Sequence, residues 1–343
     1  MQNPRPRKKL LWQLPFLTLL IVGSVLIIRQ QQSMPYQHNE GFVFGTSYHI
    51  TYQCDSDLHR SIQAELQKVD NSLSPFNERS IITAVNQNRK VTTDKMFQEV
   101  FQKAMEISRE TGGAFDITVA PLVNAWGFGF KSGKHPSPRQ VDSLLLLVGY
   151  EKVSMKGGQV QKQNPQTMLD CSAIAKGYGA DVVARLLRSR DVTNFMVEVG
   201  GEIVTSGVNA KRLPWKIGVT KPTDDSLSTS NELQTVLNVT DKAMATSGNY
   251  RNFYYKGGKK YAHTIDPKTG YPVQHSLLSA TVLASDCATA DAYATSFMVL
   301  GIEKARSVLE RHPELMAYFI YSDEKGQNAV WFSPSLKDKV EGQ

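Results

Sequence analysis

Apolar residues recur at helical spacing in several parts of the chain. Leu58, Ile62, Leu66 and Val69 fall on one face of a helix with 3.6 residues per turn. Similar patterns predict further helices over residues 95–109, 138–148, 177–188, 288–300 and 302–311. Most of these helices have one apolar face, which is typical of helices that pack on a folded domain.

Short runs of strand-forming residues lie between the helices, mostly after residue 151. Tyr48, Ile50 and Tyr52 alternate with polar residues inside 41–53, which predicts a strand. The strands are grouped rather than strictly alternating with helices, and this favours a compact α+β fold with largely antiparallel sheets. We expect one compact, bilobal domain over residues 41–335. The other predicted strands are 152–155, 167–171, 195–199, 215–219, 233–239, 259–265, 278–283 and 316–321.

The first 40 residues have a different composition. Residues 10–28 carry no charge and are just long enough to span a bilayer. The preceding segment, residues 1–9, contains Arg5, Arg7, Lys8 and Lys9, and this positive charge favours the cytoplasmic side. We therefore predict one N-terminal transmembrane helix, a signal anchor, followed by a polar linker over 29–40. A cleaved signal peptide is the alternative, but no small-x-small site follows the apolar run.

The net charge of +7 does not indicate nucleic-acid binding. The four basic residues of the N-terminal segment and Arg29 supply five of these charges, which leaves +2 for the rest of the chain. No basic stripe remains to follow a phosphate backbone. Nucleic acid is therefore excluded as a partner.

The three cysteines, Cys54, Cys171 and Cys287, form neither a disulfide framework nor a C-x-x-C pair. A bridge between Cys171 and Cys287 is one alternative in an exported protein. Small buried thiols are the other.

Residues 263–270, His-Thr-Ile-Asp-Pro-Lys-Thr-Gly, follow a predicted strand with tight-turn chemistry. Pro267 fixes φ, Gly270 accepts a positive φ, and Asp266 can bond its own backbone. His263 and Thr269 are not needed for such a turn. The corner is therefore either a plain hairpin or a place where an imidazole, a carboxylate and a hydroxyl meet for catalysis.

Two further segments carry candidate ligand-binding groups. Residues 170–177 precede a predicted helix, whose N-terminus together with Lys176 could seat a phosphate. Asp291 and Thr295 are four positions apart on another predicted helix, so they share a face. Completed by carbonyl, water and phosphate oxygens, such a pair suits Mg²⁺. An ordinary helix start with a solvated lysine is the alternative for the first segment.

Three more segments have both a structural and a functional interpretation. Residues 112–119 lead into an aromatic cluster around Trp126. Residues 197–203 predict a strand that ends at two glycines, where a ligand could approach the backbone closely. Phe76 offers a ring on which a base could stack, although most such rings belong to the core.

Taken together and in order, these segments resemble the ApbE-type family of FAD:protein FMN transferases. The resemblance covers nearly everything after about residue 41. Its motifs are weak singly but specific as a set. They lie at residues 45–48, 74–76, 114–118, 126–129, 175–177, 198–201, 245–248, 263–272 and 291–295.

The resemblance implies a cofactor site and a metal site. The backbone carbonyl of Ala173 would join Asp291 and Thr295 around Mg²⁺, with Ala294 close by. Phe76 would stack on the adenine of FAD, and Phe44 would approach the flavin. Further FAD contacts are implied at Ala114, Phe115, Asp116, Asp170, Lys176, Thr269 and Leu278.

It also implies a reaction. The family transfers FMN from FAD to a Ser or Thr hydroxyl of an acceptor protein and releases AMP. His263 or Asp266 would take the hydroxyl proton, and the imidazole, with a reference pKa of about 6.5, is favoured. Mg²⁺ and Lys176 would neutralise the developing phosphate charge. An FAD pyrophosphatase and a non-catalytic FAD-binding protein are the alternatives.

Family members are usually anchored at the bacterial inner membrane with the catalytic domain on the periplasmic side. Their acceptors are subunits of membrane redox complexes and extracytoplasmic electron carriers. This chain departs from the family pattern in three places. The family more often has Tyr at the position of Phe76 and Met at that of Phe44, and often a lipid-modified Cys near the start.

Overall fold

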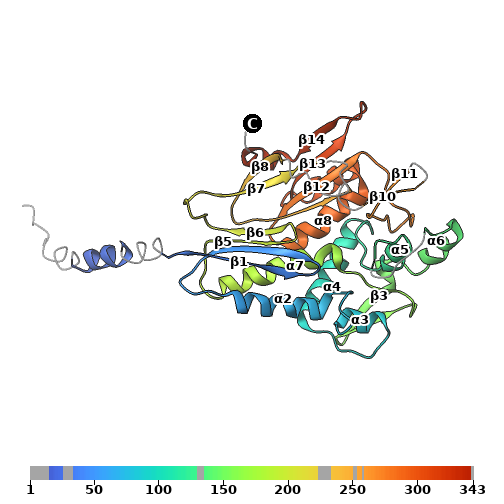
Figure 1. Cartoon of the computed structure of the whole chain (residues 1–343), viewed down its shortest axis with the longest axis horizontal. Coiled ribbons are helices and arrows are strands. Elements are labelled where there is room, and N and C mark those ends of the chain that lie inside the picture. The colour runs from blue at the N-terminus through green and yellow to red at the C-terminus, as the bar shows by residue number, and fades with distance from the viewer. Residues whose placement is uncertain are drawn as a thin grey trace, which may run out of the picture.

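An eight-stranded sheet runs through the molecule (Figure 1), in a computed structural model that describes residues 15–25, 34–129, 135–222, 233–249, 253–256 and 259–340. All its neighbouring strands are antiparallel, and their order in the sheet follows their order in the chain. The strands are β1 (Tyr36–Val43), β2 (Thr46–Gln53), β5 (Phe195–Val199), β6 (Glu202–Ser206), β9 (Ala243–Gly248), β12 (Leu277–Ala284), β13 (Met316–Ser322) and β14 (Asn328–Phe332).

Helices cover one face of this sheet (Figure 1). The alternating side chains Tyr48, Ile50 and Tyr52 of β2 meet the apolar stripes of α2 (His59–Leu73) and α7 (Ser172–Arg188). Further along the sheet, α4 (Lys95–Glu110), α8 (Cys287–Leu300) and α9 (Ile302–Arg311) bury their apolar residues against β12 and β13. The shorter helices are α3 (Ile81–Asn86), α5 (Ala120–Ala125), α6 (Pro138–Leu145), η1 (Tyr150–Lys152) and η2 (Pro334–Lys339).

Three two-stranded hairpins are inserted between the strands of the main sheet. They are β3 (Val153–Lys156) with β4 (Gln159–Lys162), β7 (Trp215–Thr220) with β8 (Leu233–Val239), and β10 (Phe253–Lys256) with β11 (Lys259–Ala262). The β7–β8 hairpin covers the face opposite the helices, where Ile217 and Leu237 pack with Met244 and Tyr318. The main sheet is therefore buried on both faces near β9 and β12.

The pairing between β6 and β9 is unusually short. Only Ile203↔Met244 and Val204↔Ala243 are paired. On one side of these pairs the Thr205 N–H still donates to the Lys242 carbonyl, but on the other side residues 200–202 and 246–248 are not paired with each other. The sheet therefore has a gap at this seam, directly beside α7 and α8.

The mixed α+β class with antiparallel sheets is confirmed, as are the helices expected around 58–69, 95–109, 288–300 and 302–311. The helix expected over 138–148 is also present but ends at Leu145. The strand predicted over 167–171 is wrong. Those residues have no regular secondary structure, because Leu169 exchanges two hydrogen bonds with the Asn86 side chain and the Asp170 N–H donates to the Ile117 carbonyl. The helix expected from 177 begins at Ser172, so Lys176 lies inside α7 and not before it.

The N-terminal region differs from expectation. Tyr36–Glu40, assigned to the linker, belong to β1, where buried Asn39 bonds to Asp57. Of the proposed anchor, residues 15–25 are helical with exposed apolar side chains such as Phe16 and Leu19, whereas 10–14 and 26–28 lie outside the described residues. None of the helices that the structure describes combines the length and apolar composition that a bilayer span requires.

All three cysteines are free thiols, and Cys171 and Cys287 are buried. Burial raises the pKa of both buried thiols well above its usual range. These two residues therefore pack as small apolar side chains.

Candidate functional site

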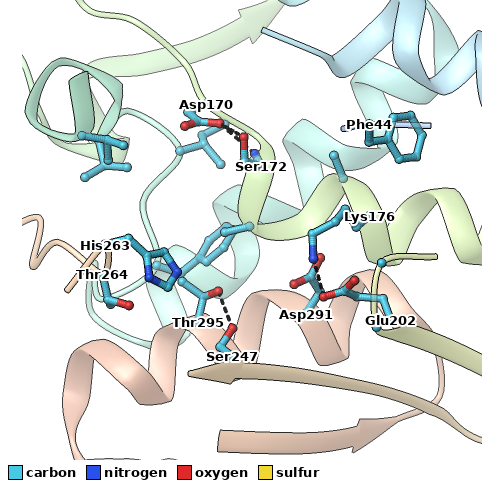
Figure 2. A pocket seen from close by; sticks show the side chains of 18 of the residues that line it. Phe44, Asp170, Ser172, Lys176, Glu202, Ser247, His263, Thr264, Asp291 and Thr295 are labelled. Carbon is cyan, nitrogen blue, oxygen red and sulfur yellow. Dashed lines mark hydrogen bonds and ion pairs between the residues drawn. The ribbon is translucent and has the colours of Figure 1, made fainter. Parts of the chain in front are cut away.

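A cavity of about 620 Å³ opens where β6 and β9 diverge. Its walls come from parts of the chain that are far apart in the sequence: the start of α7, the middle of α8, the turn after β5, the end of β9 and the corner after β11. Figure 2 shows side chains from these segments pointing into the same space. The sequence-predicted residues that line it are Phe44, Phe76, Ala114, Phe115, Asp116, Asp170, Ala173, Lys176, His263, Asp291 and Thr295.

Helices α7 and α8 carry the oxygen atoms that were predicted to bind a metal ion. Asp291 is 3% exposed, and its Oδ2 accepts a hydrogen bond of 3.1 Å from the backbone N–H of Gly177. In a regular α-helix that N–H is directed at the carbonyl of Ala173, so the carbonyl and the carboxylate compete for one donor. Thr295 lies one turn after Asp291, and its Oγ1 is 3.1 Å from Ser247 Oγ of β9. Asp291, Thr295 and Ala173 all line the same cavity.

This close approach of the two helices depends on Gly177. A Cβ atom at this position would lie 2.4 Å from the carbonyl oxygen of Cys287 and 2.9 Å from Cβ of Asp291. No larger residue fits without moving α8. Gly177 therefore sets how near Asp291 comes to the start of α7.

Lys176 lies between two buried carboxylates, as Figure 2 shows. Its Nζ is 2.5 Å from Oε1 of Glu202, a residue that is 3% exposed. Burial opposes the charged form of Lys176, but Glu202 and Asp291 outweigh it and raise the lysine pKa. Burial raises the pKa of Glu202, the Lys176 ammonium opposes that shift, and Asp291 adds to it. Oε2 of Glu202 is buried and has no hydrogen-bond partner among the described residues.

The corner after β11 places His263 on the cavity wall. The ring of Phe128, another lining residue, meets the imidazole edge to face with 6.4 Å between ring centroids. Asp266 and Thr269 do not line the cavity but form the turn, where Asp266 Oδ1 accepts from the Lys268 N–H and Thr269 Oγ1 accepts from the Tyr271 N–H. The turn is fixed to α5 by a hydrogen bond from Trp126 Nε1 to the Gly270 carbonyl, 2.8 Å long.

The two acidic residues near the start of α7 are held by local donors. Asp116 accepts hydrogen bonds from the N–H and hydroxyl of Thr118 and from the N–H of Tyr150. Asp170 accepts from the N–H and hydroxyl of Ser172. Burial raises the pKa of both carboxyl groups, against these hydrogen bonds. Both carboxylates are fixed in place at the cavity wall.

Two phenylalanines border the cavity. Phe44 occupies the β1–β2 turn at φ +53° and contacts Gly179 of α7, where there is no Cβ to keep the ring away. Phe76 follows α2 and is 69% exposed although it lines the cavity. An exposed ring beside a cavity can cover a planar ligand.

Two other predicted residues do not line the cavity. Leu278 lies in β12 and its carbonyl accepts from the Asn249 N–H. Ala294 is buried in α8 between the two candidate metal-binding residues.

Sequence reasoning did not single out Glu202, Phe128 or Ser247 as site residues, although all three line the cavity. One signal for Glu202 was available, because a charged residue directly after two glycines begins a strand that is otherwise largely buried. Ser247 stood in a recognised motif without an assigned role. Phe128 was attributed to an aromatic cluster, and its contact with His263 could not be foreseen.

The fold and the cavity define an α+β protein with a ligand site that combines aromatic rings, an ammonium, an imidazole and hard oxygen ligands. No group of three or more His, Cys, Asp or Glu residues that could hold a metal ion occurs within the described part of the chain. The chain belongs to the ApbE family, whose model matches residues 44–319.

Characterised relatives align along most of the chain. It is 38% identical over 303 residues to the FAD:protein FMN transferase of Haemophilus influenzae, which covers 83% of this chain and 86% of that protein. It is 34% identical over 312 residues to the FAD:protein FMN transferase of Escherichia coli K12, covering 87% of each.

Solved structures agree with this assignment. The flavin transferase ApbE from Vibrio cholerae superposes with a TM-score of 0.80 at 33% identity and covers 89% of this chain and 99% of that one. The apo flavinyl transferase ApbE from Pseudomonas stutzeri gives a TM-score of 0.79 at 28% identity, with 89% of this chain and 97% of that one covered.

Proposed function

We propose that this chain is an FAD:protein FMN transferase, which moves the FMN part of FAD onto a Ser or Thr hydroxyl of an acceptor protein and releases AMP. The observation that best supports this function is the cavity between β6 and β9. It brings together the Asp291–Thr295 pair, Lys176 and His263 from three segments of the chain. The family and the names of the relatives support the same reaction.

The residues divide the work by their chemistry. Phe76 and Phe44 provide apolar surfaces for the adenine and the flavin. The Lys176 ammonium stabilises negative charge on the pyrophosphate. His263 accepts the proton of the acceptor hydroxyl as its oxygen forms a bond to the FMN phosphorus. The bond from that phosphorus to the AMP oxygen breaks, and AMP leaves with the electron pair.

The corner residues have separate tasks in this proposal. His263 faces the cavity, whereas Asp266 holds the turn that carries it. The imidazole is therefore the base, and Asp266 and Thr269 act by fixing the corner.

We assign a divalent cation, Mg²⁺, to Asp291, Thr295 and the carbonyl of Ala173. The donors fit this ion, because all are hard oxygens and the buried carboxylate has one described hydrogen bond, from Gly177. When bound, Mg²⁺ supplies positive charge at the phosphate oxygens. Phosphate oxygens and waters would complete its ligand set, since it needs few protein ligands.

We further propose that residues 10–28 anchor the chain in the bacterial inner membrane, with the domain on the periplasmic side. Basic residues before an uncharged run of this length support that orientation. Its acceptors would then be membrane redox subunits or extracytoplasmic electron carriers. Protease should digest the domain in spheroplasts and not in intact cells.

To test this function, the full chain is incubated with FAD, Mg²⁺ and a candidate acceptor that has an exposed Ser/Thr segment. The acceptor should gain the mass of FMN less water while AMP appears. Free FMN and AMP with an unmodified acceptor would instead indicate a pyrophosphatase. Intact bound FAD would leave a binding protein.

A further inference from the structure

The ammonium of Lys176 has two buried carboxylates within its reach but pairs with only one. Nζ is 2.5 Å from Glu202 Oε1. Asp291 acts on the lysine electrostatically, yet the structure describes no ion pair between Asp291 and Lys176. The lysine is therefore held on the Glu202 side of the cavity.

The Glu202 side chain is held by a rigid turn. Gly200 and Gly201 join β5 to β6 with φ of +62° and +98°. The N–H of Gly200 donates to the Ser47 carbonyl, and that of Gly201 donates to Glu198 Oε1. Both amides are bonded inside the fold, so they fix the backbone directly before Glu202 and are not available to hold an anion.

The same turn makes room for the lysine stem. A Cβ at Gly200 would lie 3.2 Å from Cδ of Lys176 and 2.6 Å from Cγ2 of Thr46. The absence of a side chain there lets the stem lie along the turn toward Glu202. The turn and Glu202 thus hold the lysine from one side, opposite Asp291.

We propose that Glu202 is a positioning residue that keeps the Lys176 ammonium away from Asp291, so that the Asp291 carboxylate stays open to a divalent cation. This inference rests on the proposed function, which assigns the divalent cation to Asp291. Without the Glu202 charge, Asp291 becomes the strongest partner for the lysine. The ammonium then competes with the cation for the same oxygens.

The buried, unpartnered Oε2 of Glu202 supports this role. A buried carboxylate oxygen without a donor is costly. A shape-matched neutral amide at this position would still accept from Lys176 through one oxygen. The competition between Glu202 and Asp291 for one ammonium explains why position 202 carries a charged carboxylate and not a neutral amide.

The test measures FAD binding to the full chain by flavin fluorescence at increasing MgCl₂, without acceptor. Glu202→Gln should raise the Mg²⁺ concentration for half-maximal FAD binding at least about tenfold, the factor equivalent to about 1.4 kcal/mol. Glu99→Gln is the matched control, because Glu99 contacts α7 through Tyr178 and Arg185 outside the cavity. It should leave the midpoint unchanged.

A double variant separates positioning from direct contact with the cation. In a Lys176→Met background, Glu202→Gln should cause no further shift. A tenfold shift that persists in that background would overturn the proposal, since Glu202 would then act on the cation itself. An unchanged midpoint in the single variant, or a wild type whose FAD binding ignores Mg²⁺, would overturn it as well.

A second substitution at the same position keeps the proposal testable if Glu202→Gln does not fold. Glu202→Asp keeps the charge but withdraws the carboxylate by one methylene, so it should raise the midpoint in the same direction. Thermal unfolding without Mg²⁺ shows whether each variant is folded. Because no acceptor and no turnover are involved, a failure of the proposed transferase reaction appears in a different assay.

Discussion

The N–H of Gly177 donates to Oδ2 of Asp291 over 3.1 Å, across the contact between α7 and α8. One glycine thereby fixes both the spacing of two helices and the orientation of the carboxylate proposed to bind metal. A substitution at Gly177 should therefore affect both the stability of the fold and the proposed metal site.

Gly177→Ala should destabilise the protein. The new Cβ would meet the backbone of Cys287 at 2.4 Å, and overpacking of this kind costs roughly 1–3 kcal/mol. Gly179→Ala, two residues later, would meet the ring tip of Phe44 at 2.7 Å, which can turn away. Urea unfolding of both variants checks the difference. Equal stabilities would show that the backbone contact does not constrain the helices.

Asp291→Asn should abolish the response to Mg²⁺ and leave the fold intact. The amide keeps the shape but loses the charge that attracts the cation, so the Mg²⁺ affinity should fall at least about 100-fold. Calorimetric titration with MgCl₂ measures this. Asp181→Asn, another buried carboxylate facing α8, should keep the Mg²⁺ affinity. Equal affinities in wild type and Asp291→Asn would remove Asp291 from the metal site.

His263→Ala should retain FAD binding and slow FMN transfer roughly 10²–10⁴-fold, the usual contribution of a general base. FAD titration and the rate of acceptor mass gain give the two quantities. His38→Ala, an exposed histidine on β1, serves as the control and should transfer at the wild-type rate. Normal transfer by His263→Ala would exclude the imidazole as the base.

Phe76→Ala should weaken FAD binding without changing stability. Stacking of a base on an aromatic ring contributes about 1–3 kcal/mol, or roughly 5–150-fold in affinity. Phe42 is a matched control, since it is 74% exposed but does not line the cavity. Phe42→Ala should bind FAD normally. If both variants bind alike, the ring does not stack on the adenine.

Asp181 should make stability depend on pH. Its carboxylate accepts from the N–H groups of Cys287 and Ala288, but burial, aided by Asp286 and opposed by these bonds and Arg185, raises its pKa to about 6. Because this pKa is higher in the folded state than in the unfolded state, where it is near 3.9, the carboxyl group stabilises the fold fully at pH values below 3.9. This contribution is lost as the pH rises through 6.

Asp181→Asn removes this titration. Relative to the variant, the wild type should lose about 2 kcal/mol of unfolding free energy between pH 4 and pH 7. Denaturant titrations at the two pH values measure the difference. A pH profile shared by both proteins would place the carboxyl pKa near its ordinary value.

Much of the fold follows from local patterns, and the exceptions have physical causes. The amphipathic helix α4 was predicted from spacing alone, and Asp94 caps it. The start of α7 was misplaced because Cys171 precedes it without a side-chain cap. The strand predicted over 167–171 is absent because the backbone of Leu169 bonds to the side chain of Asn86. Asn86 is 83 residues away along the chain, so a local sequence pattern cannot reveal this contact.

The site was predictable where one element carries it. Asp291 and Thr295 share a helix face by spacing. Glu202 was missed because the turn at Gly200–Gly201 reverses the chain, and alternation along one strand cannot show whether Glu198 or Glu202 is buried. The folded sheet shows that Glu202 is buried and that Glu198 pairs with exposed His49.

The short β6–β9 pairing makes the sheet easiest to bend at the cavity. Two residue pairs close this boundary, whereas each other boundary of the sheet has at least five. Widening the sheet here breaks the fewest backbone hydrogen bonds. Among the boundaries of this sheet, the β6–β9 boundary is therefore the one where the cavity could widen with the least loss of strand pairing, and a substrate as long as FAD could be admitted with the rest of the sheet still paired.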